Sequence, residues 1–312
     1  MKVYHDIKDF RKIPNAIVTI GTFDGVHLGH QAVFKQMVDK ARQIGGETVV
    51  ITFFPHPRIV ISPNDNRLRL ITSQEDKIEH LRRSNIDNLI IINFTKEFSH
   101  TSSEDFIKDY VVRYIQPAIL VIGYDHHFGS NRSGDFDTLS KLGMEFHFAV
   151  EKINEQDIED ITISSTKIRS ALQQGDIKLA NKLLGYSYST SGIVTHGDSI
   201  GRTLGFPTAN ISIKPEYQLI EKTGVYATIV KVDGKDYLSM TYIGRRPTIS
   251  NGLPTSTETY IMDFDGDLYG KEIRVTFVDR VRDEMTFDNL ERLKSQIQED
   301  KANIIRILSN IN

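Results

Sequence analysis

The stretch AIVTI-GTFDGVHLGH-QAVFKQMVDKARQI (residues 16–44) decides the fold of the first part of the chain. Its first five residues form a short apolar, β-branched run that predicts a strand, and its last fourteen place apolar side chains on one helical face. Between them, Gly21, Gly25 and Gly29 let the backbone approach a ligand closely. A glycine loop that opens a helix presents free N–H groups and the positive end of the helix dipole, and both favour phosphate. The stretch therefore predicts a strand, a phosphate-binding turn and a helix.

The same alternation of strand and helix continues to about residue 185. Further strands are expected at 47–54, 89–94 and 118–122, with helices at 73–84 and 103–114. Such alternation predicts a parallel sheet with helices on both faces. Ligands of parallel sheets bind beyond the carboxyl ends of the strands. Three of those ends lead into loops that begin at Gly21, Pro55 and Gly123, and we expect the ligand there.

Two histidines stand inside the first of these loops. His27 and His30 are three residues apart, so they can share one face of the first helical turn. Two imidazoles there can donate hydrogen bonds to phosphate oxygens as charge develops in a transition state. The alternative is a glycine turn whose histidines only cap the helix or face water.

The pattern changes near Tyr186. Short β segments follow one another without intervening helices, at 189–196, 225–232, 235–243, 258–263 and 272–279. Glycine-rich turns separate them, which predicts a small barrel. A final amphipathic helix at about 288–308 is expected to pack on it. We therefore expect two domains, residues 1–185 and residues 186–312.

A second segment with candidate ligand-binding residues, GDSIGRTLGFPTAN, occupies residues 197–210. Its glycines and proline predict a long shaped loop. Thr208 and Asn210 offer neutral oxygen ligands that suit a hard cation such as Mg²⁺, and Arg202 can meet a phosphate. An ordinary surface loop between two strands would explain the glycines alone.

Composition limits the remaining classes of function. The net charge is −3, which argues against broad binding to nucleic acid or to acidic membranes. The absence of cysteine excludes disulfides and thiolate zinc sites. The opening residues MKVYHDIKDF do not resemble a secretory signal, and no apolar run is long enough to span a bilayer, so we expect a cytoplasmic protein. The sequence leaves the oligomeric state open.

Two motifs in the first domain resemble a known family. GTFDGVHLGH is similar to the His-x-Gly-His signature of nucleotidyltransferases, in the version of the prokaryotic bifunctional riboflavin kinase/FMN adenylyltransferases. Residues 163–169, ISSTKIR, resemble the Ser-Ser-Thr-x-Ile-Arg motif of that family. The resemblance implies a Rossmann-like nucleotidyltransferase domain. It also implies ATP contacts from Gly21, Phe23, Gly25, His27, His30, Ser164, Ser165 and Arg169, and it makes His27, His30 and Arg169 catalytic.

A third motif, GYDHHFG at residues 123–129, resembles the family loop that lies against nucleotide and flavin. The resemblance implies that Asp125 and Phe128 contact the flavin. Two departures could weaken adenylation: His126 stands where the family usually has an aromatic residue, and Phe54 stands where an acidic residue is common. The Asp125-His126-His127 cluster could alternatively hold a transition metal.

The second domain carries its own set of matches. Residues 197–210 resemble the Pro-Thr-Ala-Asn signature of riboflavin kinases, and residues 258–265 resemble the Glu-Thr strand of that family. The implied fold is a six-stranded Greek-key barrel with a C-terminal helix, and the implied general base is Glu258. Mg²⁺ would be held by Thr208 and Asn210. The implied ligand contacts are Gly201, Arg202, Thr208 and Asn210 for ATP, and Gly205, Phe206 and Glu258 for the flavin.

The expected function is therefore phosphorylation of riboflavin to FMN in the second domain and adenylation of FMN to FAD in the first, with ATP, riboflavin and FMN as the small-molecule partners. One alternative is a working kinase beside a weakened adenylyltransferase, which would form FMN but no FAD. Another alternative is a flavin-sensing regulator that binds RNA or DNA. The net negative charge of the chain argues against this alternative.

Overall fold

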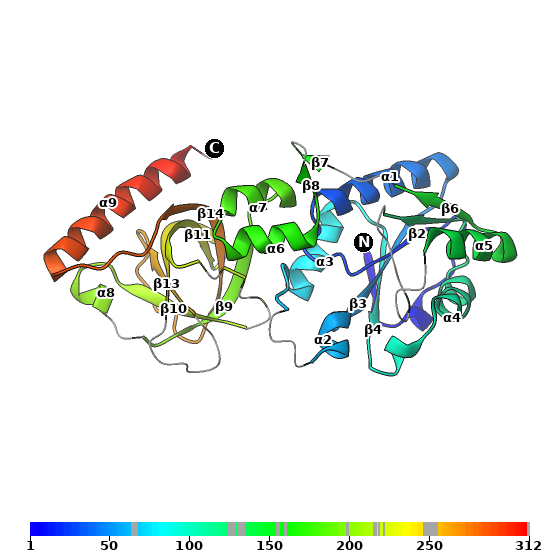
Figure 1. The fold of residues 1–312 in the computed structure, drawn as a ribbon, viewed down its shortest axis with the longest axis horizontal. Coiled ribbons are helices and arrows are strands. Elements are labelled where there is room, and N and C mark those ends of the chain that lie inside the picture. Colours follow the sequence, from blue (N-terminus) through cyan, green and yellow to red (C-terminus); the bar gives the residue numbers. More distant parts are fainter. Residues whose placement is uncertain are drawn as a thin grey trace. The chain divides into compact units, whose positions relative to one another are not determined.

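The computed structural model describes residues 1–63, 68–123, 129, 135–153, 157–158, 161–197, 200–214, 217, 219–220, 222–245 and 255–310. The chain forms two compact units (Figure 1). The first comprises residues 1–68 and 73–164, and the second comprises residues 69–72 and 165–312.

A six-stranded parallel sheet forms the centre of the first unit. Its strand order is β1-β4-β3-β2-β5-β6, and every neighbouring pair is parallel. The strands are β1 (Lys2–Tyr4), β2 (Ile17–Ile20), β3 (Thr48–Phe54), β4 (Asn88–Asn93), β5 (Ile119–Ile122) and β6 (Ala149–Lys152). The predicted parallel sheet is confirmed, and the four strands expected from the sequence occupy its centre.

Helices cover both faces of this sheet. The elements are η1 (Ile7–Asp9), α1 (Leu28–Ile44), α2 (Pro57–Ile61), α3 (Gln74–Arg83), η2 (Phe98–His100), α4 (Ser103–Phe106), a π-helical continuation η3 (Ile107–Val112) and α5 (Phe136–Phe146). A short hairpin of β7 (Asp157–Ile158) and β8 (Ile161–Thr162) follows β6.

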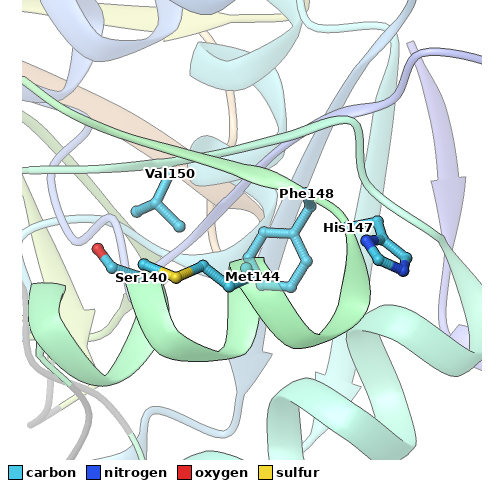
Figure 2. A pocket seen from close by; sticks show the side chains of 6 residues that line it. Ser140, Met144, His147, Phe148 and Val150 are labelled. Carbon is cyan, nitrogen blue, oxygen red and sulfur yellow. The ribbon is translucent and has the colours of Figure 1, made fainter.

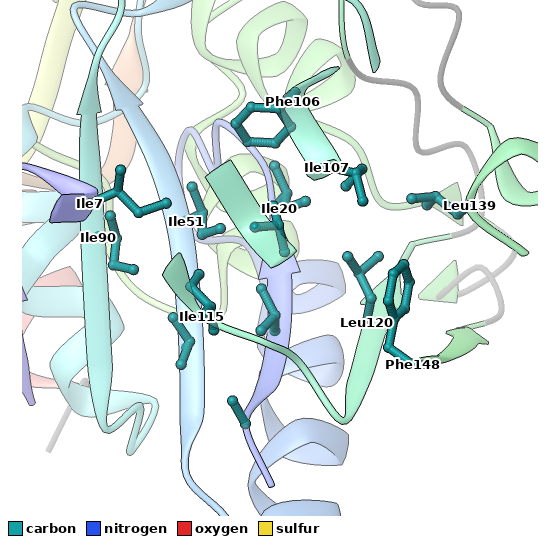
Figure 3. Packing of buried hydrophobic residues seen from close by; sticks show 14 of the residues in the cluster. Ile7, Ile20, Ile51, Ile90, Phe106, Ile107, Ile115, Leu120, Leu139 and Phe148 are labelled. Carbon is teal, nitrogen blue, oxygen red and sulfur yellow. The ribbon is translucent and has the colours of Figure 1, made fainter. Parts of the chain in front are cut away.

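The two faces are buried in two separate cores because alternate strand residues point to opposite sides. On one face, Ile20 and Ile51 pack with Phe106 and Ile107 of the α4–η3 segment, as Figure 3 shows. On the other face, neighbouring strand residues pack against Phe34 and other apolar side chains of α1. This burial on both sides fixes the strands. Because all of the strands are parallel, the loops at their carboxyl ends lie along one edge of the sheet.

The second unit is built on a closed antiparallel barrel. Around the barrel the strands run β10-β13-β12-β11-β14-β9. They are β9 (Ser189–Thr195), β10 (Thr208–Ile213), β11 (Gly224–Val232), β12 (Lys235–Arg245), β13 (Thr255–Ile261) and β14 (Glu272–Arg282). The unit also contains helices α6 (Ser165–Gln173), α7 (Ile177–Leu184), α8 (Ile200–Thr203) and α9 (Leu290–Ser309). The predicted six-stranded barrel with a C-terminal helix is confirmed.

The last helix covers part of the barrel wall. Ile304 and Leu308 of α9 pack against Val225, Ala227 and Met240 of β11 and β12. On the opposite side of the same wall, buried hydroxyl groups form a chain of hydrogen bonds through the barrel interior, from Ser239 through Thr228 and Thr241 to Thr259. The wall is therefore fixed from both sides, and the strands next to it can position polar side chains firmly.

Candidate active sites

The glycine loop joins β2 to α1 in an unusual backbone conformation. Phe23, Gly25 and Val26 all have positive φ angles, of 48°, 84° and 37°. A side chain at Gly21 would collide with the ring of Phe23, so the close turn at that position requires glycine. The loop therefore has a specific shape that brings the chain back toward the start of α1.

His27 caps the helix that follows. Its Nδ1 accepts a hydrogen bond of 3.4 Å from the backbone N–H of His30. An accepting Nδ1 is unprotonated, so the ring of neutral His27 carries its proton on Nε2. The helix therefore starts with an imidazole whose Nδ1 caps the backbone and whose Nε2 carries the proton.

The two histidines stack on each other. Their ring centroids are 3.6 Å apart and their planes differ by 17°. Nδ1 of His30 is buried and has no hydrogen-bond partner in the described structure. Burial lowers the pKa of His30 well below its usual value, and electrostatic interactions with His27 and Lys77 lower it further. His30 is therefore a neutral imidazole at neutral pH, and the expected proximity of the two rings is present.

Two charged residues near this loop were not among the predicted site residues. Asp24 is 3% exposed and Lys77, from α3, is 5% exposed. Burial lowers the pKa of Lys77 to about 8, while the charge of Asp24 raises it. Asp24 stands within the glycine motif, but no sequence pattern links Lys77 to it, because Lys77 belongs to the helix between β3 and β4.

The other two predicted loops begin beside the glycine loop. β2 lies between β3 and β5, so the chain leaves the sheet at Gly21, Pro55 and Gly123 on one edge. His56, buried at the start of α2, accepts a hydrogen bond from the backbone of Arg58. Phe54 is 46% exposed at the end of β3. Asp125, His126, His127 and Phe128 lie outside the described residues.

The Ser-Ser-Thr motif spans the border between the two units. Ser164 is the last residue of the first unit, and Ser165 is the first residue of α6 in the second. Arg169 lies one turn further along α6. Its Nε donates a hydrogen bond of 2.8 Å to the carbonyl oxygen of Arg69, which belongs to the same unit.

The second candidate site lies on two neighbouring barrel strands. Asn210 on β10 is directly opposite Glu258 on β13, and Thr208 is opposite Tyr260. The hydroxyl of Thr208 donates a hydrogen bond of 3.4 Å to Oε2 of Glu258. All three polar side chains are half-buried. The structure therefore brings the carboxylate of Glu258 beside a hydroxyl and an amide that lie about 50 residues earlier in the sequence.

The segment at residues 197–210 is more ordered than predicted. The sequence analysis expects one long loop, which is wrong: residues 200–203 form α8 and Thr208 begins β10. The prediction failed because the apolar alternation of β10 starts only after its first three, half-buried residues. Gly197 lies so close to Asn210 that a side chain there would collide with the Asn210 amide. At Gly201 a side chain would collide with the Phe206 carbonyl.

The same segment contains three further predicted residues. Arg202 on α8 is exposed. Gly205 has a positive φ of 85°. Phe206 is buried, and its ring meets that of Tyr260 edge-on at 5.3 Å.

One further residue near Glu258 was not predicted. Tyr242 on β12 is directly opposite Glu258 on its other side. Its hydroxyl donates a hydrogen bond to Glu284. Burial raises the pKa of the Tyr242 hydroxyl above its usual range, and the hydrogen bond and the charges of Glu284 and Glu258 raise it further. A tyrosine on an alternating strand gives no signal of its own in the sequence.

A separate hollow in the first unit lies between α5 and β6 (Figure 2). Its lining includes Ser140, Met144, His147, Phe148 and Val150. These residues stand where β6 begins, which is the amino-terminal edge of the sheet and not the edge that carries the glycine loop.

Two features are absent from the described residues. Within the described ranges, no group of three or more histidine, aspartate or glutamate side chains is arranged to hold a metal ion. Of the described helices, none combines the length and the apolar character needed to cross a membrane.

Two family models match the chain, one on each part. The model described as FAD synthetase matches residues 10–167, and the model described as riboflavin kinase matches residues 184–308. The first model covers the glycine loop, and the second covers the β10–β13 strand pair.

Curated relatives match over nearly the whole chain. A bifunctional riboflavin kinase/FMN adenylyltransferase from Listeria monocytogenes is 39% identical, with 92% of this chain and 90% of the relative covered. Proteins of the same name from Bacillus subtilis and Escherichia coli K12 are 38% and 34% identical, over 99% and 96% of this chain and 96% of each relative.

A solved structure from Streptococcus pneumoniae has the same fold. It carries the name macrolide-efflux protein, is 31% identical, and superposes with a TM-score of 0.86 over 96% of this chain and 97% of the other.

Proposed function

This chain belongs to the family of bifunctional riboflavin kinases/FMN adenylyltransferases, and we propose that its glycine loop serves adenylation and its β10–β13 strand pair serves phosphorylation. The enzyme forms FMN from riboflavin and FAD from FMN, with an FAD synthetase domain followed by a riboflavin kinase domain. We place the border of the two activities at residue 185, so that residues 1–185 adenylate and residues 186–312 phosphorylate.

For adenylation, we propose that His27 and His30 bind the phosphates of ATP. The N-cap position supports this, since His27 keeps an Nε2–H donor at the positive end of α1. An oxygen of the FMN phosphate attacks the α-phosphorus of ATP. The bond between that phosphorus and the oxygen that bridges it to the β-phosphate breaks, and pyrophosphate leaves. Such a transfer depends on in-line positioning and neutralisation of charge.

Further ATP contacts in this reaction are assigned by motif. They are the backbone of the glycine loop and the Ser-Ser-Thr motif, namely Gly21, Phe23, Gly25, Ser164, Ser165 and Arg169. Arg169 adds a fixed cation for a triphosphate. We assign flavin contacts to Asp125 and Phe128 on the strength of the family loop alone.

For phosphorylation, we propose that Glu258 is the general base. The carboxylate would accept the proton of the riboflavin 5′-hydroxyl as the γ-phosphoryl group arrives. The single observation that carries this proposal is the alignment of Glu258 with Asn210 across paired strands, with Thr208 hydrogen-bonded to the same carboxylate. Gly201 and Arg202 would contact ATP, and Gly205 and Phe206 would contact the flavin.

The same strand pair offers suitable ligands for Mg²⁺. A hydroxyl, an amide oxygen and a carboxylate are the hard oxygen donors that Mg²⁺ prefers, and Thr208 and Asn210 would hold it. When bound, the ion neutralises charge on the transferring phosphates. We propose a cytoplasmic enzyme, since both reactions consume ATP, with ATP, riboflavin and FMN as its partners and no nucleic acid.

The experiment that tests this division measures both reactions in two variants. His30→Ala removes a phosphate ligand, so FAD formation from FMN should fall at least about 100-fold while FMN formation from riboflavin stays within about twofold. Glu258→Gln should give the converse result, because an amide cannot accept the proton. Chromatographic separation of FMN and FAD gives both rates.

Equal loss of both activities in either variant, with the fold intact, would refute the division. The same assay on the unaltered chain tests the alternative that Phe54 and His126 suggest, a kinase beside a weakened adenylyltransferase. No FAD from FMN, ATP and Mg²⁺ in excess, while riboflavin is still phosphorylated, would establish it.

A further inference from the structure

Glu258 has an amide beside it on one strand and a tyrosine beside it on the other. Asn210 of β10 and Tyr242 of β12 are its directly opposite neighbours in the barrel wall. Side chains that stand opposite each other on paired strands lie within contact distance. The tyrosine is large enough to cover the carboxylate, so the direction of its ring matters for the proposed base.

The Tyr242 ring is directed along its own strand. A side-chain carbon at Gly244 would lie 2.5 Å from Cε1 of this ring and 2.8 Å from its hydroxyl oxygen. Residues two apart on a strand share one face and are about 6.7 Å from each other, a span that an extended tyrosine side chain covers. The ring therefore lies over the backbone of Gly244 rather than across the strands toward Glu258.

Two further contacts hold the ring in this direction. Its hydroxyl donates a hydrogen bond to Glu284, two residues beyond the end of β14. The backbone of this segment is fixed in turn, since Nη1 of Arg282 donates a hydrogen bond of 2.9 Å to the carbonyl oxygen of Asp283. The Tyr242 ring also packs at the border of the apolar core that α9 covers. A hydrogen bond, an apolar border and the bare backbone of a glycine thus define one orientation.

The Glu258 side chain is directed the other way. Its Oε2 accepts the hydrogen bond of 3.4 Å from the Thr208 hydroxyl on β10, whereas Tyr242 stands on β12. The two side chains therefore diverge from directly paired positions. A ring turned across the strands would instead lie against the carboxylate and shield it from a substrate hydroxyl.

We propose that Tyr242 is a positioning residue for phosphorylation: seated on Gly244 and bonded to Glu284, its ring stays off Glu258, so that the riboflavin 5′-hydroxyl can reach the carboxylate. This inference rests on the proposed role of Glu258 as the general base. Gly244 contributes by having no side chain, and Glu284 contributes as the acceptor of the tyrosine hydroxyl.

The test uses the full chain and the variant Gly244→Ala, which adds one methyl group under the ring. The three atoms nearest to that methyl all belong to Tyr242, so the ring must move. Apparent affinity falls with the fraction of molecules whose site is open. The kcat/KM for riboflavin should therefore fall about tenfold, through KM more than through kcat, while adenylation of supplied FMN stays within about twofold.

A second variant shows whether the methyl acts through the ring. Tyr242→Ala/Gly244→Ala has no ring to displace, so its kcat/KM for riboflavin should return to within about threefold of the unaltered chain. Tyr237→Ala/Gly244→Ala is the matched control. Tyr237 lies on the same strand, where its ring meets that of Phe264 edge-on at 5.3 Å, and its removal should restore nothing.

A third set of variants tests the hydrogen bond separately from the glycine. Tyr242→Phe keeps the ring and removes the donor, and Glu284→Ala removes the acceptor. Each should lower kcat/KM for riboflavin about threefold, which is the effect of one ordinary hydrogen bond. The double variant Tyr242→Phe/Glu284→Ala should lose no more than either single variant, because both changes break the same contact.

Two results would overturn the proposal. One is a normal rate of riboflavin phosphorylation by Gly244→Ala that is folded by circular dichroism. The other is a Tyr242→Ala/Gly244→Ala variant that is no faster than Gly244→Ala. If Gly244→Ala does not fold, the hydrogen-bond variants decide: no loss in Tyr242→Phe, or losses that multiply with Glu284→Ala, would equally overturn it.

Glu258→Gln distinguishes failure of this inference from failure of the proposed function. If Glu258→Gln cannot phosphorylate riboflavin while Gly244→Ala is normal, only the positioning role of Tyr242 fails. If Glu258→Gln phosphorylates riboflavin at the normal rate, the assignment of the base itself fails.

Discussion

His27 shows how one side chain can serve both the fold and the chemistry. As the N-cap of α1 it uses Nδ1 to accept the backbone N–H of His30, which fixes the tautomer and directs Nε2–H elsewhere. The spacing of His27 and His30 predicted that the two rings could share one helical face, and they stack at 3.6 Å. The spacing did not predict that Lys77 would lower the pKa of His30, because a charged residue on a distant helix leaves no pattern in the sequence.

Gly197 offers a second test at the scale of one residue. A methyl group at this position would collide with the amide of Asn210, the side chain opposite Glu258. Gly197→Ala should therefore lower kcat/KM for riboflavin phosphorylation by about tenfold or more, because the amide must move away from the carboxylate. Steady-state kinetics of FMN formation measure this effect, and adenylation of supplied FMN serves as the internal control.

A double variant shows whether the new methyl acts through that amide. In a chain that already carries Asn210→Ala, the additional Gly197→Ala change should have little further effect, because the colliding group is gone. Independent, multiplying losses would contradict the proposed path from Gly197 to Asn210.

At the scale of elements, the sequence predicted the strands that have a strong apolar pattern. The central strands β2, β3, β4 and β5 are continuous apolar runs, since both of their faces are buried, and all four were expected. The edge strand β6 was missed because it is short and none of its four residues is fully buried. The motif in β10 was taken for a loop because its glycines and proline precede a strand whose first three residues carry polar or small side chains.

For the candidate sites too, the sequence revealed only local patterns. Within a site, residues close in sequence were predicted from their motif, as with Thr208 and Asn210. The placement of Glu258 beside them was implied only by family resemblance, because strand pairing in the barrel brings it there. Tyr242 and Lys77 were missed, since each reaches its site from another strand or helix without a motif.

Helix α9 allows a prediction about how one element is fixed. Asp300 on this helix is 1% exposed, and Arg282 at the end of β14 donates to it from Nε and Nη2, at 2.9 and 2.7 Å. Asp300→Ala leaves the guanidinium without its buried partner, so the free energy of unfolding of the second unit should fall by about 3 kcal/mol. Denaturant unfolding followed by circular dichroism measures this change.

The matched control for Asp300 lies next to the same helix. Asp288 forms an ion pair with Arg292, and both side chains are largely exposed. Asp288→Ala should therefore cost less than about 1 kcal/mol. Equal losses in the two variants would show that burial of the Arg282–Asp300 pair is not what anchors α9.

At the scale of the whole molecule, two kinds of core support two kinds of site. The parallel sheet places its loops at the carboxyl ends of strands, where backbone N–H groups and a helix start can meet phosphates. The barrel instead presents polar side chains from neighbouring strands, fixed by cross-strand pairing. His27 and His30 follow a strand of the sheet, and Glu258 lies on a strand of the barrel, so the two reactions should be separable by mutation.

The most direct test of that separation mixes two variants, each of which lacks one of the two reactions. His30→Ala and Glu258→Gln are each supplied with riboflavin, ATP and Mg²⁺, alone and together in equal amounts, and FMN and FAD are separated by chromatography. We expect FMN without FAD from His30→Ala, neither product from Glu258→Gln, and FAD from the mixture, because FMN released by one protein is adenylated by the other. If the mixture makes FMN but no FAD, although Glu258→Gln adenylates supplied FMN, or if either variant loses both reactions while folded, the account of two independent sites is contradicted.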